Sequence, residues 1–212
     1  MRLDHVSYAA PPEHLADVVQ RIGATVGAPL VDGGLHPRFG TRNFVLPLGG
    51  GTYLEVVAAL DHPAADHAPF GQAVKAAAAA GGGWLGWVVA VDDIAPVEAR
   101  VGRPAVVGNR HRPDGFDLRW QQIGVRDLMD DPQLPFFVHW LVEPAEHPSA
   151  GGRADLRIDR LEIAGDPDVV AAWLGAPADH MLDGTGVQWV EDEEPGLVAV
   201  HVATPHGVVR LD

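Results

Sequence analysis

Cysteine is absent from the 212-residue sequence. The fold therefore cannot depend on disulfides, and no catalytic step can use a thiolate nucleophile. Thiolate metal sites are excluded for the same reason. Any bound metal ion must be held by histidine, aspartate or glutamate side chains.

Basic residues are scarce. The chain has 15 lysines and arginines against 29 aspartates and glutamates, which gives a formal net charge of −14, and the basic residues form no run. A chain of this charge repels phosphate backbones and anionic membrane surfaces. We therefore expect no nucleic acid and no membrane among its partners, and we attribute the acidity to solubility rather than to a cationic ligand.

Long hydrophobic runs are the third absence. No apolar stretch approaches the length that spans a membrane, and the first residues follow a strand-like pattern rather than that of a signal peptide. Hydrophobic residues make up 47% of the chain and charged residues 21%, as in ordinary globular proteins. We expect a folded, cytoplasmic protein of one or two domains.

The sequence does contain a repeated order of elements. The first module has a strand, a helix and two further strands, at residues 3–9, 13–22, 43–48 and 52–58. The second has the same order, at 84–91, 93–100, 116–122 and 135–142. The third follows it again, at 157–164, 167–174, 187–190, 198–203 and 208–211. A helix at 70–80 and a linker at 143–155, rich in proline, glycine and alanine, connect the modules. The pattern predicts curved sheets that enclose a small-molecule site.

Aligning the first two modules places candidate ligands at equivalent positions. The opening strands set His5 against Trp87, and the closing strands set Glu55 against His139. Alternate strand residues face opposite sides of a sheet, and a pseudo-two-fold axis brings equivalent inward positions together. His5, Glu55 and His139 are then expected to converge. Two imidazoles and one carboxylate form a ligand set used for Fe(II), Zn(II), Mn(II) or Ni(II).

Each of these residues also has a purely structural interpretation. His5 and His139 can be hydrogen-bonded histidines of the core, and Glu55 can form a salt bridge to Arg38 or Arg119. Glu55 is the strongest candidate, because a carboxylate in an apolar strand is costly to bury unless it is paired or bound to a metal.

Several motifs resemble those of the glyoxalase-like proteins of the vicinal oxygen chelate superfamily. They are Leu3-Asp4-His5-Val6, His36-Pro37-Arg38-Phe39-Gly40-Thr41-Arg42-Asn43, Tyr53-Leu54-Glu55, and Leu134-Pro135-Phe136-Phe137 with Trp140 and His147-Pro148. The resemblance spans residues 1–150. It implies an α+β fold in which two βαβββ modules, 1–60 and 84–143, form curved mixed sheets around a central cavity. Residues 156–212 add a C-terminal βαβββ-like module.

The resemblance also implies roles for particular residues. It gives His5 and Glu55 the role of ligands to a divalent metal ion, which is Zn, Fe, Mn or Ni, and it places His139 at the third ligand position. Trp87 stands at the fourth and cannot coordinate an ion, so a water or substrate oxygen would fill that side. Trp87 is therefore expected in the wall of the substrate pocket.

A second group of polar residues is expected near the pocket. His36 is a candidate proton carrier near neutral pH, and Asn43 is a candidate substrate contact. The alternative for this segment is a turn, because Gly33 and Gly34 interrupt it. Arg119 either meets an anionic substrate or stays solvated at the surface.

The main functional hypothesis is a metal-dependent, glyoxalase-like enzyme of the lyase or isomerase type that acts on a small oxygen-chelating metabolite. The metal ion would stabilise an enediolate or oxyanion while His36 or Glu55 moves a proton. One alternative is an extradiol-type dioxygenase. The other is a metal-free protein of the bleomycin-resistance type that sequesters a small molecule, which Trp87 favours.

The third module is expected to supply no metal ligand, because Arg160 stands where the first module has His5. Its apolar strands need a cover. We expect them to pack against the first two modules or against a second copy of the chain in a homodimer.

Overall fold

The computed structural model describes residues 1–177 and 181–212. It contains three βαβββ modules. The first comprises β1 (Arg2–Ala9), α1 (Leu15–Val26), β2 (Val31–His36), β3 (Thr41–Pro47) and β4 (Tyr53–Ala59). The second comprises β5 (Gly83–Ala90), α4 (Ala95–Val101), β6 (Val106–His111), β7 (Asp117–Ile123) and β8 (Phe136–Trp140). The third comprises β9 (Arg157–Ala164), α6 (Pro167–Leu174), β10 (Gly186–Val190), β11 (Gly196–Thr204) and β12 (Gly207–Leu211).

Short helices connect these elements. Helices α2 (Pro63–His67) and α3 (Pro69–Ala79) lie between the first and second modules, and α5 (Val125–Asp130) lies between β7 and β8. Three short 3-10 helices span Pro12–His14, Gly49–Gly51 and Pro144–Glu146. No helix among the described residues is long and apolar enough to cross a membrane.

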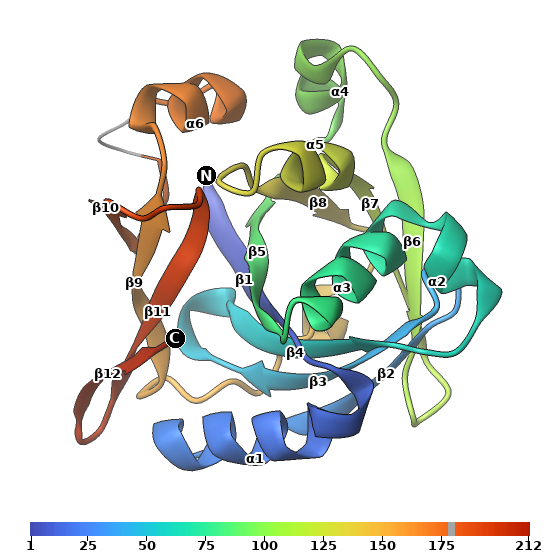
Figure 1. The fold of residues 1–212 in the computed structure, drawn as a ribbon, viewed down its shortest axis with the longest axis vertical. Helices are drawn as coiled ribbons and strands as arrows, with labels where there is room; N and C mark the ends of the chain where they lie inside the picture. Colours follow the sequence, from blue (N-terminus) through green and yellow to red (C-terminus); the bar gives the residue numbers. More distant parts are fainter. Residues whose placement is uncertain (178–180) are drawn as a thin grey trace.

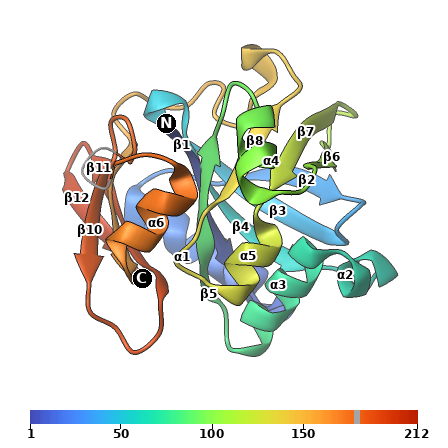
Figure 2. The same cartoon turned by 90° about the horizontal axis from the view of Figure 1, so that it is seen from above.

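The first two modules form a closed barrel with strand order β1-β4-β3-β2-β6-β7-β8-β5 (Figure 1). The third module forms a separate sheet, β10-β9-β11-β12. It stands on one side of the barrel, and α2 and α3 lie on the opposite side (Figure 2). The expected α+β fold of repeated βαβββ modules with curved mixed sheets is confirmed.

The two modules of the barrel meet along two unequal seams. Seven residue pairs join β1 to β5, from Arg2↔Ala90 to Ala9↔Gly83. A single residue pair, Leu35↔His111, joins β2 to β6. The barrel is therefore held firmly on one side and by much less backbone pairing on the other.

Strands β2 and β6 do not follow from the sequence pattern, because their glycines suggest loops. A Cβ added at Gly33 of β2 would lie 2.2 Å from Oδ1 of Asn43, and one added at Gly108 of β6 would lie 2.4 Å from the ring of Trp120. A glycine in a strand often marks such a close approach by a neighbour. These glycines make room for side chains of the adjacent strands.

The third module packs against the outside of the barrel in the same chain. Leu161 of β9 and Val200 of β11 share one hydrophobic cluster with Val6 of β1 and Trp87 of β5. A second cluster lies on the cavity side of the barrel and includes Val88, Phe136 and Val138. One face of β1 and β5 thus faces the third module while the other faces the cavity.

Deleting residues 156–212 is expected to make the protein insoluble, although His5 and Glu55 remain. The deletion would expose fully buried side chains such as Leu3, Val6 and Trp87, and a large exposed apolar patch drives aggregation. Size-exclusion chromatography with light scattering measures this outcome.

A point substitution tests the same interface without shortening the chain. Leu161→Asp places a charge among fully buried apolar side chains and should also cause aggregation, whereas Val208→Asp lies at a position that is 56% exposed and should not. A soluble, monomeric truncated protein would show instead that the third module is an independent appendage.

Candidate functional site

The barrel contains a small, partly enclosed cavity between its strands. Its wall contains six aromatic side chains, from Phe39, Tyr53, Phe70, Trp120, Phe136 and Trp140. The polar side chains in the wall are those of His5, His36, Glu55, Arg110 and Gln122. A small set of polar groups in an otherwise apolar, enclosed space is typical of a small-molecule site.

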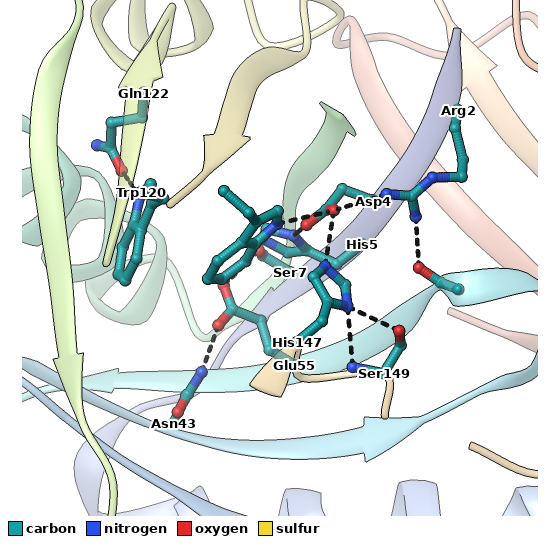
Figure 3. A network of polar contacts seen from close by, with 12 residues as sticks. Arg2, Asp4, His5, Ser7, Asn43, Glu55, Trp120, Gln122, His147 and Ser149 are labelled. Carbon is teal, nitrogen blue, oxygen red and sulfur yellow. Dashed lines mark hydrogen bonds and ion pairs between the residues drawn. The ribbon is translucent and has the colours of Figure 1, made fainter. Parts of the chain in front are cut away.

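Glu55 lies in the middle of β4 and is 3% exposed. Its Oε1 accepts a hydrogen bond from Ser7 Oγ at 2.6 Å, and its Oε2 accepts one from Asn43 Nδ2 at 2.7 Å (Figure 3). Burial raises the pKa of this carboxyl, but the nearby imidazole of His5 and the two hydrogen bonds outweigh burial, so the pKa lies below its usual value. The carboxylate is ionised at neutral pH and fixed in orientation.

His5 is held by a buried carboxylate. Its Nδ1 lies 2.8 Å from Oδ2 of Asp4, its ring stacks on Tyr53, and its Nε2 lies 3.7 Å from Oε1 of Glu55. Adjacent strand residues normally face opposite sides, but the pairing of β1 with β5 shifts its register between Leu3 and His5. This irregularity at Asp4 has the form of a β-bulge, which re-aims side chains.

Asp4 accepts two further hydrogen bonds. Trp140 Nε1 donates to its Oδ1 at 3.0 Å. His147 Nε2 lies 3.1 Å from the same oxygen (Figure 3). Burial raises the pKa of the Asp4 carboxyl, but the hydrogen bonds and electrostatic interactions with His147 and His5 outweigh burial and hold the pKa well below its usual range. Asp4 therefore remains ionised within the protein.

His36 lies at the end of β2 with its ring against Phe39, Phe70 and Trp120. Its Nδ1 is 2.8 Å from Oγ1 of Thr41. Burial lowers the pKa of His36 to about 3, so the imidazole is neutral at pH 7. The structure thus brings His36 and Glu55 into one cavity, with Asn43 behind Glu55 as its hydrogen-bond donor.

The register of the strands corrects the expected alignment of the two modules. Strand β4 pairs with β1 through His5↔Tyr53, and β8 pairs with β5 through Val88↔Phe136. Tyr53 and Phe136 both line the cavity, so Val88, and not Trp87, is the equivalent of His5. By the same register, Val138 is the equivalent of Glu55 and lines the cavity with it.

A shift of one residue turns a strand side chain to the opposite face. Trp87 therefore lies in the core outside the cavity, where its Nε1 donates to the carbonyl oxygen of Gln133. His139 is also outside the cavity, with Nδ1 3.1 Å from the carbonyl oxygen of Val91. The structure does not bring His139 together with His5 and Glu55.

Arg119 lies outside the cavity as well. Its neighbour Trp120 points inward, so Arg119 faces the solvent with 65% of its side chain exposed and pairs with Asp117. The arginine that does line the cavity is Arg110, on the adjacent strand β6.

The resemblance to vicinal oxygen chelate proteins implies a divalent metal ion, and the side chains present test that implication. His5 and Glu55 can offer one nitrogen and one oxygen, but the equivalent positions in the second module carry Val88 and Val138, which cannot coordinate an ion. In the described part of the chain, no group of three or more histidine, aspartate and glutamate side chains is arranged to hold a metal. The residues present do not fit the expected three-ligand site.

Ser7, Asp4 and Arg110 are site residues that sequence reasoning missed. The parity of β1 gives a signal for Ser7, which lies two residues after His5 and faces the same way. A strand assignment for residues 106–111 would have placed Arg110 on the inward face with Gly108. The bulge that aims Asp4 at His5 leaves no mark in the sequence.

Comparison with known proteins gives a family and a fold. The sequence model of a glyoxalase-like domain matches residues 3–178. No curated protein matches the chain. The structure of a hypothetical protein from Staphylococcus aureus is similar over 100% of this chain and 98% of its own, with 13% identity and a TM-score of 0.71. It shares the overall fold, the third module included.

Methylmalonyl-CoA epimerases give weaker matches. The enzyme from Mycobacterium tuberculosis is 16% identical over 66% of this chain and 86% of its own, with a TM-score of 0.44. A Streptomyces coelicolor epimerase in complex with 2-nitronate-propionyl-CoA is 17% identical over 66% of this chain and 96% of its own, with a TM-score of 0.43. Similarity at this level says nothing about the substrate of this chain.

The low pKa of His36 predicts a pH dependence of stability. The unfolded chain binds a proton at this histidine near pH 6.5, whereas the folded protein does so only near pH 3, so the stabilisation present above pH 6.5 is lost as the pH falls toward 3. Between pH 7 and pH 5, the wild type should lose about 2 kcal/mol more free energy of unfolding than His36→Gln.

Urea denaturation at the two pH values measures this difference. His206→Gln, which changes an exposed histidine in the turn between β11 and β12, is the control and should keep the wild-type response. An identical pH response in the wild type and in His36→Gln would contradict the assignment of a neutral, buried His36.

Proposed function

The chain belongs to the glyoxalase-like domain family of the vicinal oxygen chelate superfamily, and from this premise we propose that it is an enzyme that moves a proton on a carbon atom beside a carbonyl group of a small molecule. The observation that carries the proposal is the ionised carboxylate of Glu55, which is buried in a cavity lined by six aromatic rings. A buried, ionised and oriented carboxylate is suited to act as a general base.

Glu55 is the proposed base. Each carboxylate oxygen has two lone pairs, and Ser7 and Asn43 use one on each oxygen. An unused lone pair can take the proton from the substrate carbon, whose electrons then move onto the carbonyl oxygen to give an enolate. When an apolar substrate displaces water, the loss of solvent raises the pKa of Glu55 from its lowered value and makes the carboxylate a stronger base. Protonation of the opposite face of the same carbon completes an epimerisation, and protonation of the neighbouring carbon of an enediolate completes an isomerisation.

His36 is the proposed partner of the enolate oxygen. When the Thr41 hydroxyl donates to Nδ1, the ring proton sits on Nε2. Nε2 has no hydrogen-bond partner among the residues that the structure describes and can donate into the cavity. Because burial lowers the pKa of His36 to about 3, the ring acts as a neutral donor. A neutral donor stabilises negative charge on oxygen without adding a charge that would neutralise Glu55.

His5 is proposed to keep Glu55 in its working state. The Asp4 carboxylate orients the ring so that Nε2 faces Glu55 Oε1 at 3.7 Å. A carboxylate behind a histidine fixes the tautomer and the direction of the ring. His5 is thus placed to exchange a proton with Glu55 between turnovers.

Metal-free sequestration of an apolar ligand is the second candidate function. The six aromatic rings of the cavity favour it, since aromatic side chains supply most of the contact area in small-molecule sites. In this case the ligand would bind unchanged, and Glu55 would serve only as a polar group of the wall.

Deuterium incorporation from solvent tests the proposed proton transfer. We expect the wild type to accelerate exchange at the carbon beside the carbonyl group in at least one of 2-oxobutyrate, phenylpyruvate and dihydroxyacetone, followed by proton NMR in D₂O. Glu55→Gln keeps the size of the side chain but removes the base, and should slow the exchange by roughly 10²- to 10⁴-fold. Glu13→Gln, at an exposed position in the first 3-10 helix, should leave it unchanged.

Other outcomes separate the alternatives. Binding of these compounds without any exchange would favour sequestration. Loss of exchange after dialysis against EDTA, with about one divalent ion per chain in the untreated protein and none in Glu55→Gln, would favour the metal-dependent enzyme. Equal exchange rates in the wild type and in Glu55→Gln would reject Glu55 as the base.

A further inference from the structure

Arg110 is a buried cation for which the described residues supply no partner. It is 3% exposed, and its Nε has no hydrogen-bond acceptor. Among the described residues no ion pair or hydrogen bond involves its guanidinium group. The nearby Arg112, by contrast, pairs with Asp114 and Glu146. Arg110 therefore differs from the paired arginines of the surface.

The side chain of Arg110 borders the candidate site. The side chain projects from β6 into the wall of the cavity and also borders an outer groove beside Arg112 and His147. Glu55, the anionic side chain of the cavity wall, accepts its hydrogen bonds from Ser7 and Asn43 and none from Arg110 among the described residues. The donors of Arg110 are thus left for a molecule that enters the cavity.

Burial makes this arrangement costly for an empty protein. An arginine stays charged even in the interior, although burial lowers the pKa of Arg110 from its usual value. Burying an unpaired charge is strongly unfavourable, whereas a paired and hydrogen-bonded charge is tolerated. An anion in contact with Arg110 would recover much of this cost and so bind with added affinity.

We infer that Arg110 binds the carboxylate group of the substrate and that the substrate is a small monocarboxylate with an apolar body. The planar guanidinium fork matches one carboxylate through two parallel hydrogen bonds. A phosphate dianion would need more positive charge, but His36 is neutral at pH 7 and Arg112 is already paired. The six aromatic rings accommodate the apolar body.

Arg110 and Glu55 together orient this substrate. The carboxylate is attracted to Arg110 and repelled by the ionised Glu55, so the reacting carbon, and not the carboxylate, is presented to the base. This orientation rests on the proposed function. The binding of a carboxylate by Arg110 does not, and it is measured separately.

Binding of matched acids and amides tests the inference. The probes are benzoate with benzamide, phenylacetate with phenylacetamide, and 2-oxobutyrate with 2-oxobutyramide, followed by tryptophan fluorescence, because Trp120 and Trp140 line the cavity, and by calorimetry. At least one acid should bind the wild type 10-fold or more tightly than its amide. Arg110→Met should weaken binding of that acid by roughly 10- to 100-fold without changing binding of the amide.

Two further variants serve as comparisons. Arg110→Lys keeps the charge but loses the fork, and should recover only part of the affinity. Arg157→Met removes the same charge from an exposed position on β9, where 63% of the side chain is exposed, and should bind both probes as the wild type does. The thermal midpoint of Arg110→Met should equal or exceed that of the wild type, because the variant removes an unpaired buried charge.

Several outcomes would overturn the inference. Three concern binding: equal binding of all acids and their amides by the wild type, unchanged acid binding in Arg110→Met, and tighter binding of inorganic phosphate than of any acid. The fourth is a large fall in the thermal midpoint of Arg110→Met, which would indicate a structural role for Arg110. Glu55→Gln should keep or strengthen acid binding because it removes a negative charge. If this variant binds acids while no compound exchanges deuterium in the wild type, the proposed function fails and the role of Arg110 stands.

Discussion

The buried carboxylate of Asp4 is the interaction on which the polar half of the site depends. It is fully buried and receives hydrogen bonds from His5 on β1, from Trp140 on β8 and from His147 in the segment that follows. A carboxylate taken out of water must be satisfied by such donors. These contacts hold the His5 ring toward Glu55 and join the segment after β8 to β1.

The barrel has two similar modules but a chemically one-sided cavity. His5, Tyr53 and Glu55 of the first module face Val88, Phe136 and Val138 at the equivalent positions of the second. The first module thus supplies the titratable groups and the second supplies aliphatic and aromatic surface. A ligand in this cavity would meet polar contacts on one side and apolar contacts on the other. Arg110 and Gln122 are the exceptions, because they are polar groups contributed by the second module.

The sequence was sufficient for the order of the modules and for the inward direction of His5, His36 and Glu55. Apolar periodicity identified most strands, since half-buried strands alternate with period two. Strands β2 and β6 could not be predicted, because each contains a glycine, which suggests a loop. Each glycine makes room for a side chain of the adjacent strand, and the sequence alone does not show that contact. Because β6 was not predicted, Arg110 was not recognised as a residue of the cavity wall.

The register of the second module does not follow from its sequence pattern. Its closing strand, Phe136-Phe137-Val138-His139-Trp140, is apolar on both faces, so alternation does not reveal which residues point inward. A register error of one residue was enough to place Trp87 and His139 in the cavity and to suggest a third metal ligand. The register is fixed by the pairing of β8 with β5 in the folded sheet. The sequence alone does not show which residues pair.

The unequal seams of the barrel differ in how many backbone pairs would be lost if the barrel opened along them. Seven residue pairs join β1 to β5, and one joins β2 to β6. Separation of β2 from β6 would therefore break the fewest backbone hydrogen bonds. His36 and Arg110 lie on the two strands that border this seam, whereas Glu55 lies on β4, farther around the wall. The cation of the cavity therefore lies beside the weaker seam, and the carboxylate lies farther from it along the wall.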